Sequence, residues 1–132
     1  MSEKVTFNTI RAEIIKGISD IPVYTEQLFE IKEFPCVIIA YDKTKYEYHG
    51  SRKKTIHHYC FSVIDKLSNH GSEKEPESYK KAQNLCYEKA SEILDEILGE
   101  FPGMQIAELV PGEDIFMQNR ICMSAGILEI AE

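Results

Sequence analysis

A short apolar run at residues 36–41 limits the folds open to this chain more than any other feature. Its β-branched residues Val37, Ile38 and Ile39 favour a strand. Because side chains alternate along a strand, the run presents apolar groups on both faces. A strand of this kind is covered on two sides, so we expect it at the centre of a sheet.

Length and composition indicate one globular domain. The chain has 132 residues, of which 43% are hydrophobic and 28% charged, and both values are ordinary for a folded protein. A single domain at 1–132 is therefore expected. The longest apolar run is too short to cross a bilayer, so we expect no membrane association. The first residues lack the pattern of a signal peptide, and we expect the protein to stay inside the cell that makes it.

Two segments carry the periodicity of amphipathic helices. In residues 7–18 the apolar side chains recur at spacings of three, four and one, which places them on one stripe. The second segment starts with a capping-box pattern at residues 72–75 and has Pro76 in its first turn. Its apolar stripe continues to Gly99. The pattern predicts an N-terminal helix and one long central helix.

A charged hairpin is expected after the central strand. Residues 45–48 and 56–64 flank a turn-rich segment at residues 49–52, which predicts a loop longer than the two-residue turns. In residues 56–64, large apolar side chains alternate with semi-polar ones. This alternation predicts one face in the core and one semi-polar face.

The remaining segments complete the expected fold. Residues 22–34 fit either a short strand or an extended connection. A second hairpin is expected to close the chain, in the order strand 104–110, turn 111–114, short strand 115–117 and long strand 120–130. The sum is an α+β fold, with the N-terminal helix and the long central helix packed on a mostly antiparallel sheet.

Charge is distributed unevenly along the chain. The net charge of −7 argues against a surface that grips nucleic acid, because phosphate binding needs clustered Lys and Arg. Residues 43–66 nevertheless carry six basic and two acidic side chains, whereas residues 73–132 carry five basic and thirteen acidic ones. This polarity favours head-to-tail contact between copies, and it is equally compatible with solvated faces.

No residue pattern predicts a catalytic or metal site. His57, His58 and Cys60 form the most metal-like group, but alternation along a strand places His57 opposite the other two, and no fourth ligand is evident. A cysteine nucleophile would also need a third, orienting group. The cysteines lack metal-ligand spacing and are expected to be buried apolar side chains: Cys36, Cys60, Cys86 and Cys122. We expect no enzyme activity, no metal and no cofactor.

The order of these segments resembles small tail-completion or tail-terminator proteins of long-tailed bacteriophages. The matching segments cover about three quarters of the chain: residues 7–18, 23–24, 34–39, 45–54, 57–65 and 76–98. The resemblance implies a structural virion protein of the phage neck or tail, which forms a hexameric ring that ends the tail tube and joins it to the head connector. Terminator, connector and other neck proteins remain open as subfamilies.

The resemblance also implies partners and a location. The partners would be other copies of the chain, the tail tube protein and the head connector protein. DNA would pass through the lumen of the ring without specific binding. The protein would be part of the virion and would occupy the host cytoplasm during assembly.

The hairpin is the expected contact surface between subunits or with a partner. Its candidate residues are Tyr46, Tyr48, Arg52, Lys53 and Lys54, with the tyrosines as the anchors. Two other classes of function remain open. One is a non-catalytic adaptor or regulatory protein of a mobile element that binds a protein partner. The other is a small enzyme or ligand-binding domain, which would need a cleft lined by the two histidines or Cys60.

Overall fold

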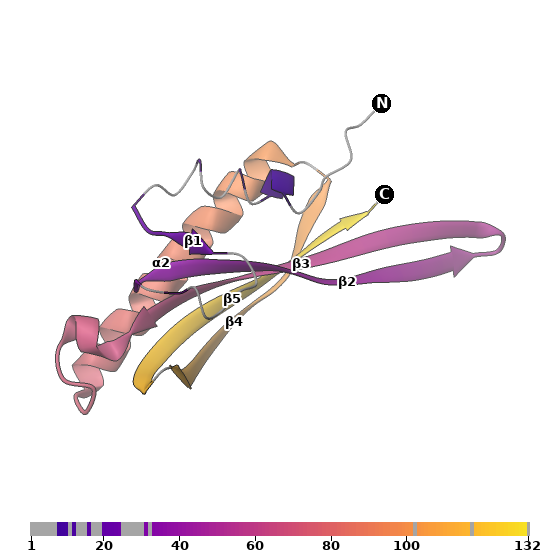
Figure 1. The fold of residues 1–132 in the computed structure, drawn as a ribbon. Coiled ribbons are helices and arrows are strands. Elements are labelled where there is room, and N and C mark those ends of the chain that lie inside the picture. Colours follow the sequence, from indigo (N-terminus) through magenta and orange to yellow (C-terminus); the bar gives the residue numbers. More distant parts are fainter. Residues whose placement is uncertain are drawn as a thin grey trace.

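The structure is a computed structural model, and it describes residues 8–10, 12, 16, 20–24, 31, 33–101, 103–116 and 118–131. Its elements follow in the order β1 (Val23–Tyr24), β2 (Cys36–His49), β3 (Arg52–Lys66), η2 (Leu67–His70), α2 (Pro76–Glu100), β4 (Met104–Phe116) and β5 (Asn119–Ala131). The described strands form one five-stranded sheet in the order β1-β2-β3-β5-β4 (Figure 1). β1 runs parallel to β2 and the other neighbours are antiparallel. The α+β class and the mostly antiparallel sheet are therefore confirmed.

The apolar run begins β2 and is flanked by strands on both sides. Val37 pairs with Val23 of β1 and with Val63 of β3. The middle strand of the described sheet is β3, one position away from the expected centre. Both faces of the run are nevertheless covered, because Val37 and Cys36, which point to opposite faces, are each fully buried.

The first hairpin is longer and tighter than the sequence indicates. β2 continues as one strand from Cys36 to His49, with an irregularity between Tyr41 and Lys43. His49 pairs with Arg52, so the loop has two residues, and the expectation of a longer loop is wrong. Gly50 has a φ of 66°, whereas the next residue does not have a positive φ. This pattern is typical of a type II′ turn, in which Gly at the first central position matches the twist of the strands.

The long helix α2 packs on one face of the sheet and makes the main core with it (Figure 1). Pro76 is its first residue, as expected, but the N-cap residue is Glu75 and no side-chain cap bond forms, so the predicted capping box is wrong. Its buried stripe includes Ala82, Cys86, Ala90 and Ile93. The side chains that β3 presents to this stripe are Tyr59, Phe61 and Val63, all buried, which confirms its predicted core face.

A smaller apolar cluster lies on the opposite face of the sheet. Its buried members are Ile31, Cys36, Ile64 and Ile121. Phe34 packs at its edge, with its ring centroid 6.1 Å from that of Phe116 in an edge-to-face arrangement. The cluster covers the second face of β2 near Cys36.

The N-terminal helix is described only in part. Residues 8–10 form a short helical piece, and residues 12 and 16 are also helical, while the rest of the expected helix at 7–18 lies outside the described residues. Ile10 is fully buried in the main core. Among the helices that the structure describes, none is both long and apolar enough to cross a membrane.

The second hairpin differs from the expected one in its turn. β4 continues as one strand from Met104 to Phe116, with an irregularity between Ile106 and Glu108, so the predicted turn at residues 111–114 lies inside a strand. Pro111 is tolerated because β4 is an edge strand, where one N–H group need not pair. The chain reverses after Phe116, which pairs with Asn119, and Gln118 there has a φ of 68°.

Candidate functional site: a projecting arm and a pocket beside the helix

Residues 43–55 form a two-stranded extension of the sheet, which we call the arm. β5 pairs with β3 only from Ile56 onward, so within the described chain the strands of the arm pair only with each other. Figure 1 shows the arm projecting far beyond α2 and the rest of the sheet. An isolated two-stranded ribbon is marginally stable in water. The arm therefore depends on its continuity with the sheet and on contacts at its base.

The base of the arm carries a polar connection between its strands. Thr44 Oγ1 and His57 Nδ1 lie 3.0 Å apart, and the Tyr41 hydroxyl is hydrogen-bonded to the same Thr44 oxygen. The rings of Tyr41 and Tyr59 meet edge to face, with centroids 5.8 Å apart. These contacts lie next to the irregularity after Tyr41 and fix the direction in which the arm leaves the sheet.

The two faces of the arm differ in chemistry. Tyr46, Tyr48 and Lys53 share the face that continues the α2 side of the sheet, as the pairing of the strands shows. Tyr46 is 54% exposed and Tyr48 70% exposed. The Lys53 ammonium lies 5.1 Å from the Tyr46 ring centroid, a cation–π contact. Tyr48, nearer the turn, makes no such contact among the described residues.

The opposite face of the arm is mainly basic. It carries Lys45, Arg52 and Lys54, all exposed, and Glu47, whose carboxylate lies 3.7 Å from the Lys45 ammonium. The five residues predicted from the sequence are thus gathered at one exposed site, with the tyrosines and Lys53 on one face and the other two basic side chains on the opposite face. Their role in binding remains a prediction.

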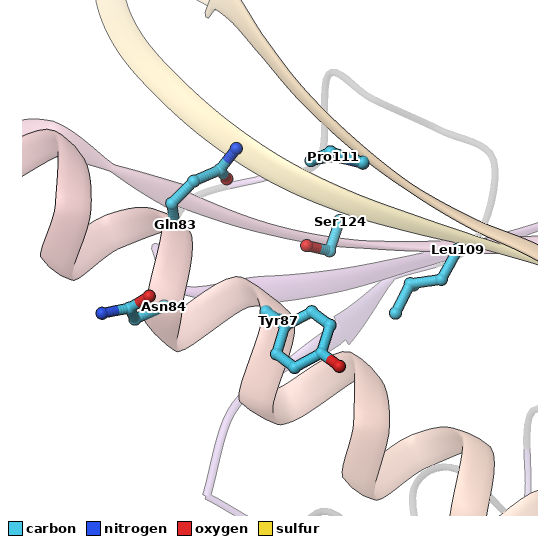
Figure 2. Close-up of a pocket in the computed structure, with 6 residues that line it drawn as sticks. All are labelled: Gln83, Asn84, Tyr87, Leu109, Pro111 and Ser124. Atoms are coloured by element: carbon cyan, nitrogen blue, oxygen red, sulfur yellow. The ribbon is translucent and has the colours of Figure 1, made fainter.

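A pocket lies between α2 and the sheet on the α2 side (Figure 2). It has a volume of about 250 Å³ and is lined by Gln83, Asn84 and Tyr87 of α2, Leu109 and Pro111 of β4, and Ser124 of β5. Tyr87 is 60% exposed at its rim, whereas Ser124 is buried. The Gln83 Oε1 atom is buried and has no hydrogen-bond partner among the described residues. The walls of the pocket are therefore mostly apolar.

The elements around the pocket are acidic. α2 and β4 together carry nine acidic and three basic side chains. The arm carries five basic and one acidic side chain. Glu88 is exposed next to Tyr87, and Glu113 is exposed two residues beyond Pro111 on the same face of β4. The α2 and β4 elements taken together and the arm thus have opposite net charge, as the sequence indicates for the two parts of the chain.

The histidines and cysteines do not come together as a ligand set. His57 faces the Thr44 side of the arm base, while His58 lies on the other face, with Nδ1 3.7 Å from Glu129 Oε1. Among the described residues there is no group of three or more His, Cys, Asp or Glu side chains placed to hold a metal ion. Cys60 is half-buried on the His58 face. The pocket of Figure 2 involves none of these three residues.

Three of the four cysteines are fully buried thiols, as expected, whereas Cys60 is only half-buried, so the expectation is wrong for it. Burial raises the pKa of Cys36 and of Cys86 to about 12, with a smaller contribution from the negative charge of Asp65. Burial also raises the pKa of Cys122 to about 11, followed by the charge of Glu113. Such thiols are poor nucleophiles, because the thiolate is the reactive form.

A buried polar cluster joins the end of β3 to the start of α2, and sequence analysis missed it. Asp65 is fully buried and accepts hydrogen bonds from Asn69 Nδ2 at 2.7 Å and from the backbone N–H of the next residue, and its second oxygen lies 2.5 Å from His70 Nε2. Asn69 also donates to the Phe34 carbonyl, and the buried Ser78 hydroxyl donates to the His70 carbonyl. The only sequence signal is a polar residue at the core position of an alternating strand. The cluster fixes the connection and does not form an open site.

No protein-family model and no curated protein sequence matches this chain. The functional argument therefore depends on the described geometry. Its outstanding features are an exposed aromatic and basic arm, and an acidic surface with a small pocket.

Proposed function

We propose that this protein is a structural component of a bacteriophage neck or tail, and that its copies form a hexameric ring that ends the tail tube and joins it to the head connector. The observation that carries the proposal is the arm, which holds Tyr46 and Tyr48 in an exposed position far from the core of their own copy. Exposed tyrosines are typical anchors of protein interfaces. The bacteriophage assignment itself comes from the resemblance in the order of the segments.

A ring is supported by the different chemistry of the two surfaces. The arm is basic and the α2–β4 surface is acidic, so the arm of one copy complements a different surface of the next. A contact between two different surfaces is heterologous, and it generates a ring when the repeated rotation closes. A contact of identical patches would instead give a dimer. The two-surface arrangement therefore favours a ring over a simple pair.

The net charge of −7 is compatible with a channel for DNA. If the basic arms are covered by neighbouring copies, the remaining exposed surface of the assembly is mostly acidic. An acidic lumen repels phosphates, so DNA would pass without specific binding. The proposed partners besides DNA are other copies, the tail tube protein and the head connector protein.

Native mass measured by light scattering tests the proposal. We expect a particle of six times the 15.2 kDa chain mass, either for the protein alone or after tail tube protein is added. A monomer at high concentration under both conditions would overturn the proposal. A monomer or dimer that binds one protein partner without forming a ring would instead favour the adaptor function.

Charge reversal on the arm tests which surface drives assembly. The triple variant Arg52→Glu, Lys53→Glu, Lys54→Glu should prevent ring formation, because it places acidic arms against an acidic surface. A matched control reverses Lys16, Lys66 and Lys74, which lie outside the arm, α2 and β4, and changes the net charge equally. If both triple variants assemble like the unmodified chain, the arm is not the contact surface.

A further inference from the structure

The sheet carries an apolar surface on the side away from α2, which we call the open face. Its apolar side chains lie in two neighbouring cross-strand rows: Ile38, Ala125 and Val110 in one, and Ala40, Cys60 and Ile127 in the other. Ser62 completes the first row and Glu108 the second. The members in β2, β3 and β5 are half-buried, and Val110 in β4 is 43% exposed. The open face therefore spans four strands and is partly exposed to solvent.

An apolar open face calls for an explanation in a sheet with a helix on its other side. Antiparallel sheets of this kind normally present polar side chains to solvent. α2 packs on the opposite face (Figure 1), and the small cluster around Cys36 and Ile64 lies beyond the first row, at the end remote from the arm. Contiguous exposed apolar side chains, unlike scattered ones, are typical of interaction sites. The open face is therefore a candidate contact surface.

The face of the arm that carries Tyr46 and Tyr48, which we call the tyrosine face, fits this surface. Both surfaces are formed by strands, so they can pack as one sheet layer on another. The exposed tyrosine rings supply apolar area, while their hydroxyl groups reach polar surroundings at the rim. The tyrosine face and the open face of one copy point to opposite sides of the sheet. They can therefore meet only between two copies.

The opposite directions of the two surfaces also suit a ring. The arm projects beyond the rest of the sheet (Figure 1), so the tyrosine face is displaced from the open face along the strands. A neighbouring copy that is shifted along the arm, without being turned over, brings its open face onto the tyrosine face. Such a contact is heterologous, and it generates a ring when the repeated rotation closes. The pocket beside α2 lies on the same side as the tyrosines, so its use would require an inverted neighbour.

Charge complementarity links the tyrosine face to the β4 end of the open face. Lys53, which lies over the Tyr46 ring, is exposed and is the charged side chain of the tyrosine face. Glu108 is exposed at the β4 end of its row and forms no ion pair within the described part of the chain. Glu113 does not take this role, because it lies on the α2 side of β4 and its carboxylate is 4.0 Å from the Arg120 guanidinium. Lys53 and Glu108 therefore attract each other across the contact.

The remaining charges near the open face determine how the arm lies on it. Glu129 is one row nearer the arm, where its carboxylate is 3.7 Å from His58 Nδ1. Lys43 lies at the β2 end of that row and repels Lys53. Lys66 lies on the other side of the small cluster. Together these charges favour an orientation with Lys53 over β4 and not over β2.

We propose that the tyrosine face of one copy packs on the open face of the next copy, with Lys53 beside Glu108. The inference rests on the proposed function, because it identifies the surface that receives the arm within the ring. Tyr46 and Tyr48 are the anchors of the contact, and the two charges orient the arm on the sheet. The open face is thus a subunit contact surface.

Cross-linking between two substituted chains tests the position of the arm. Both chains carry Cys60→Ser, which leaves only fully buried native thiols. One chain has Thr55→Cys, which faces the same way as Tyr46 and spares both tyrosines, and the other has Val110→Cys. Under the condition in which the unmodified chain assembles, a short bifunctional thiol reagent should link positions 55 and 110. The control replaces Val110→Cys with Ile115→Cys, 69% exposed on the α2 side of β4, and should give no link.

Mixing two defective chains tests whether the contact joins two different surfaces. Tyr46→Ser with Tyr48→Ser removes the anchors of one chain, and Val110→Lys places a charge on the open face of the other. Each chain alone should assemble only at an about thirty-fold higher concentration. An equimolar mixture should give a particle of twice the 15.2 kDa chain mass, because only one intact arm and one intact open face can pair. Ile115→Lys is the matched control and should assemble like the unmodified chain.

Exchange of the two charges tests the pairing of Lys53 with Glu108. Lys53→Glu and Glu108→Lys should each raise the concentration at which half of the protein assembles by about two- to five-fold, the range of an exposed ion pair. The chain with both changes should assemble more readily than either single variant. Lys53→Glu combined with Glu113→Lys should show no recovery. A double variant at positions 53 and 108 that is weaker than both single ones would overturn the pairing.

Native mass, measured on the same samples, separates the two proposals. Rings that give no link between positions 55 and 110, or a link to position 115, overturn the docking on the open face and leave the proposed function standing. A mixture of the two defective chains that stays monomeric, while the unmodified chain forms rings, has the same meaning. Monomers under all conditions, including with tail tube protein, overturn both proposals. Rings with the expected link, together with the mixed dimer, support both.

Discussion

Replacing Gly126 with alanine should destabilise the protein through one cross-strand contact. Gly126 of β5 pairs with Phe61 of β3. A Cβ atom added at Gly126 would lie 2.5 Å from both Cε1 and Cζ of the Phe61 ring, whereas real Cβ contacts are essentially never shorter than 3.0 Å. Phe61 is fully buried against the α2 core, so its ring cannot turn out to solvent. The Phe61 ring therefore occupies the space that a side chain at position 126 would fill.

The magnitude follows from the displacement that the ring would need. To reach an ordinary carbon–carbon contact of roughly 3.5–4.0 Å, the Phe61 ring must retreat by about 1 Å or more into a close-packed core. Overpacking of this kind costs about 1–3 kcal/mol. Replacing glycine in a strand also gains about 0.5–1 kcal/mol from reduced freedom of the unfolded chain. We therefore expect Gly126→Ala to lower the free energy of unfolding by about 1 kcal/mol, within a range of about 0–2.5 kcal/mol.

Urea unfolding followed by circular dichroism measures this change. The midpoint should fall while the slope stays constant, because the area exposed on unfolding hardly changes. Gly99→Ala is the matched control: nothing lies within 4 Å of the added Cβ, and alanine suits a helix, so stability should be unchanged or slightly higher. Combining Gly126→Ala with Phe61→Leu should cost at least about 0.5 kcal/mol less than the sum of the single effects. A gain in stability from Gly126→Ala, or strict additivity with Phe61→Leu, would refute the reasoning.

Four further predictions concern the cluster at the end of β3, the buried thiols, a surface ion pair and the arm. Asp65→Ala should lower the free energy of unfolding by about 2–4 kcal/mol in urea titration, because three donors lose a buried acceptor; a loss below 1 kcal/mol would contradict this. Burial raises the pKa of Cys86 to about 12 from the 9.0 of the unfolded chain, so the contribution of the protonated Cys86 thiol to stability is complete below pH 9.0 and is lost as pH rises towards 12. The free energy of unfolding, measured at pH 8, 10 and 11, should decline with pH, and Cys86→Ala should reduce that decline. The Lys89 ammonium, hydrogen-bonded to Asp20, lowers the pKa of that carboxyl below 3.8, so the stabilisation by this ion pair is present above pH 3.8 and fades as pH falls below it. Because Asp20 is exposed, Lys89→Ala should lower the free energy of unfolding by only about 0.3–0.5 kcal/mol at pH 7, as measured by thermal unfolding with and without salt. Amide hydrogen exchange should be faster at residues 43–49 than in the paired centre of β3, and it should slow when the protein assembles. Equal protection of residues 43–49 and of the centre of β3 in the monomer would contradict the marginal stability of the arm.

The sequence predicts the elements whose signals are local and repeated. The stripe that starts at Pro76 indicates α2 because its apolar residues recur over many turns. The alternation around Phe61 likewise predicts which face of β3 enters the core. The exposed aromatic and basic residues of the hairpin could also be predicted, because they lie around one turn signal.

Features that depend on pairing between distant segments could not be predicted in this way. The loop at Gly50 proved shorter than expected because register, and not local composition, decides where pairing ends. Pro111 and Gly112 usually signal a turn, yet they lie in β4 because an edge strand tolerates them. The Gln83 pocket arises where α2 crosses β4 and β5, and no local pattern encodes that crossing.

The arm is better suited to bind through a face than through its edges. Its strand edges carry unpaired backbone groups, which would favour strand addition by another chain, but lysines and Arg52 along the arm oppose edge-to-edge pairing. The aromatic face has no such protection, because Tyr48 is exposed and the basic residues beside it attract an acidic partner. A ribbon that is marginal by itself also gains order when a neighbouring copy covers that face. Assembly through the tyrosine face would therefore stabilise the arm.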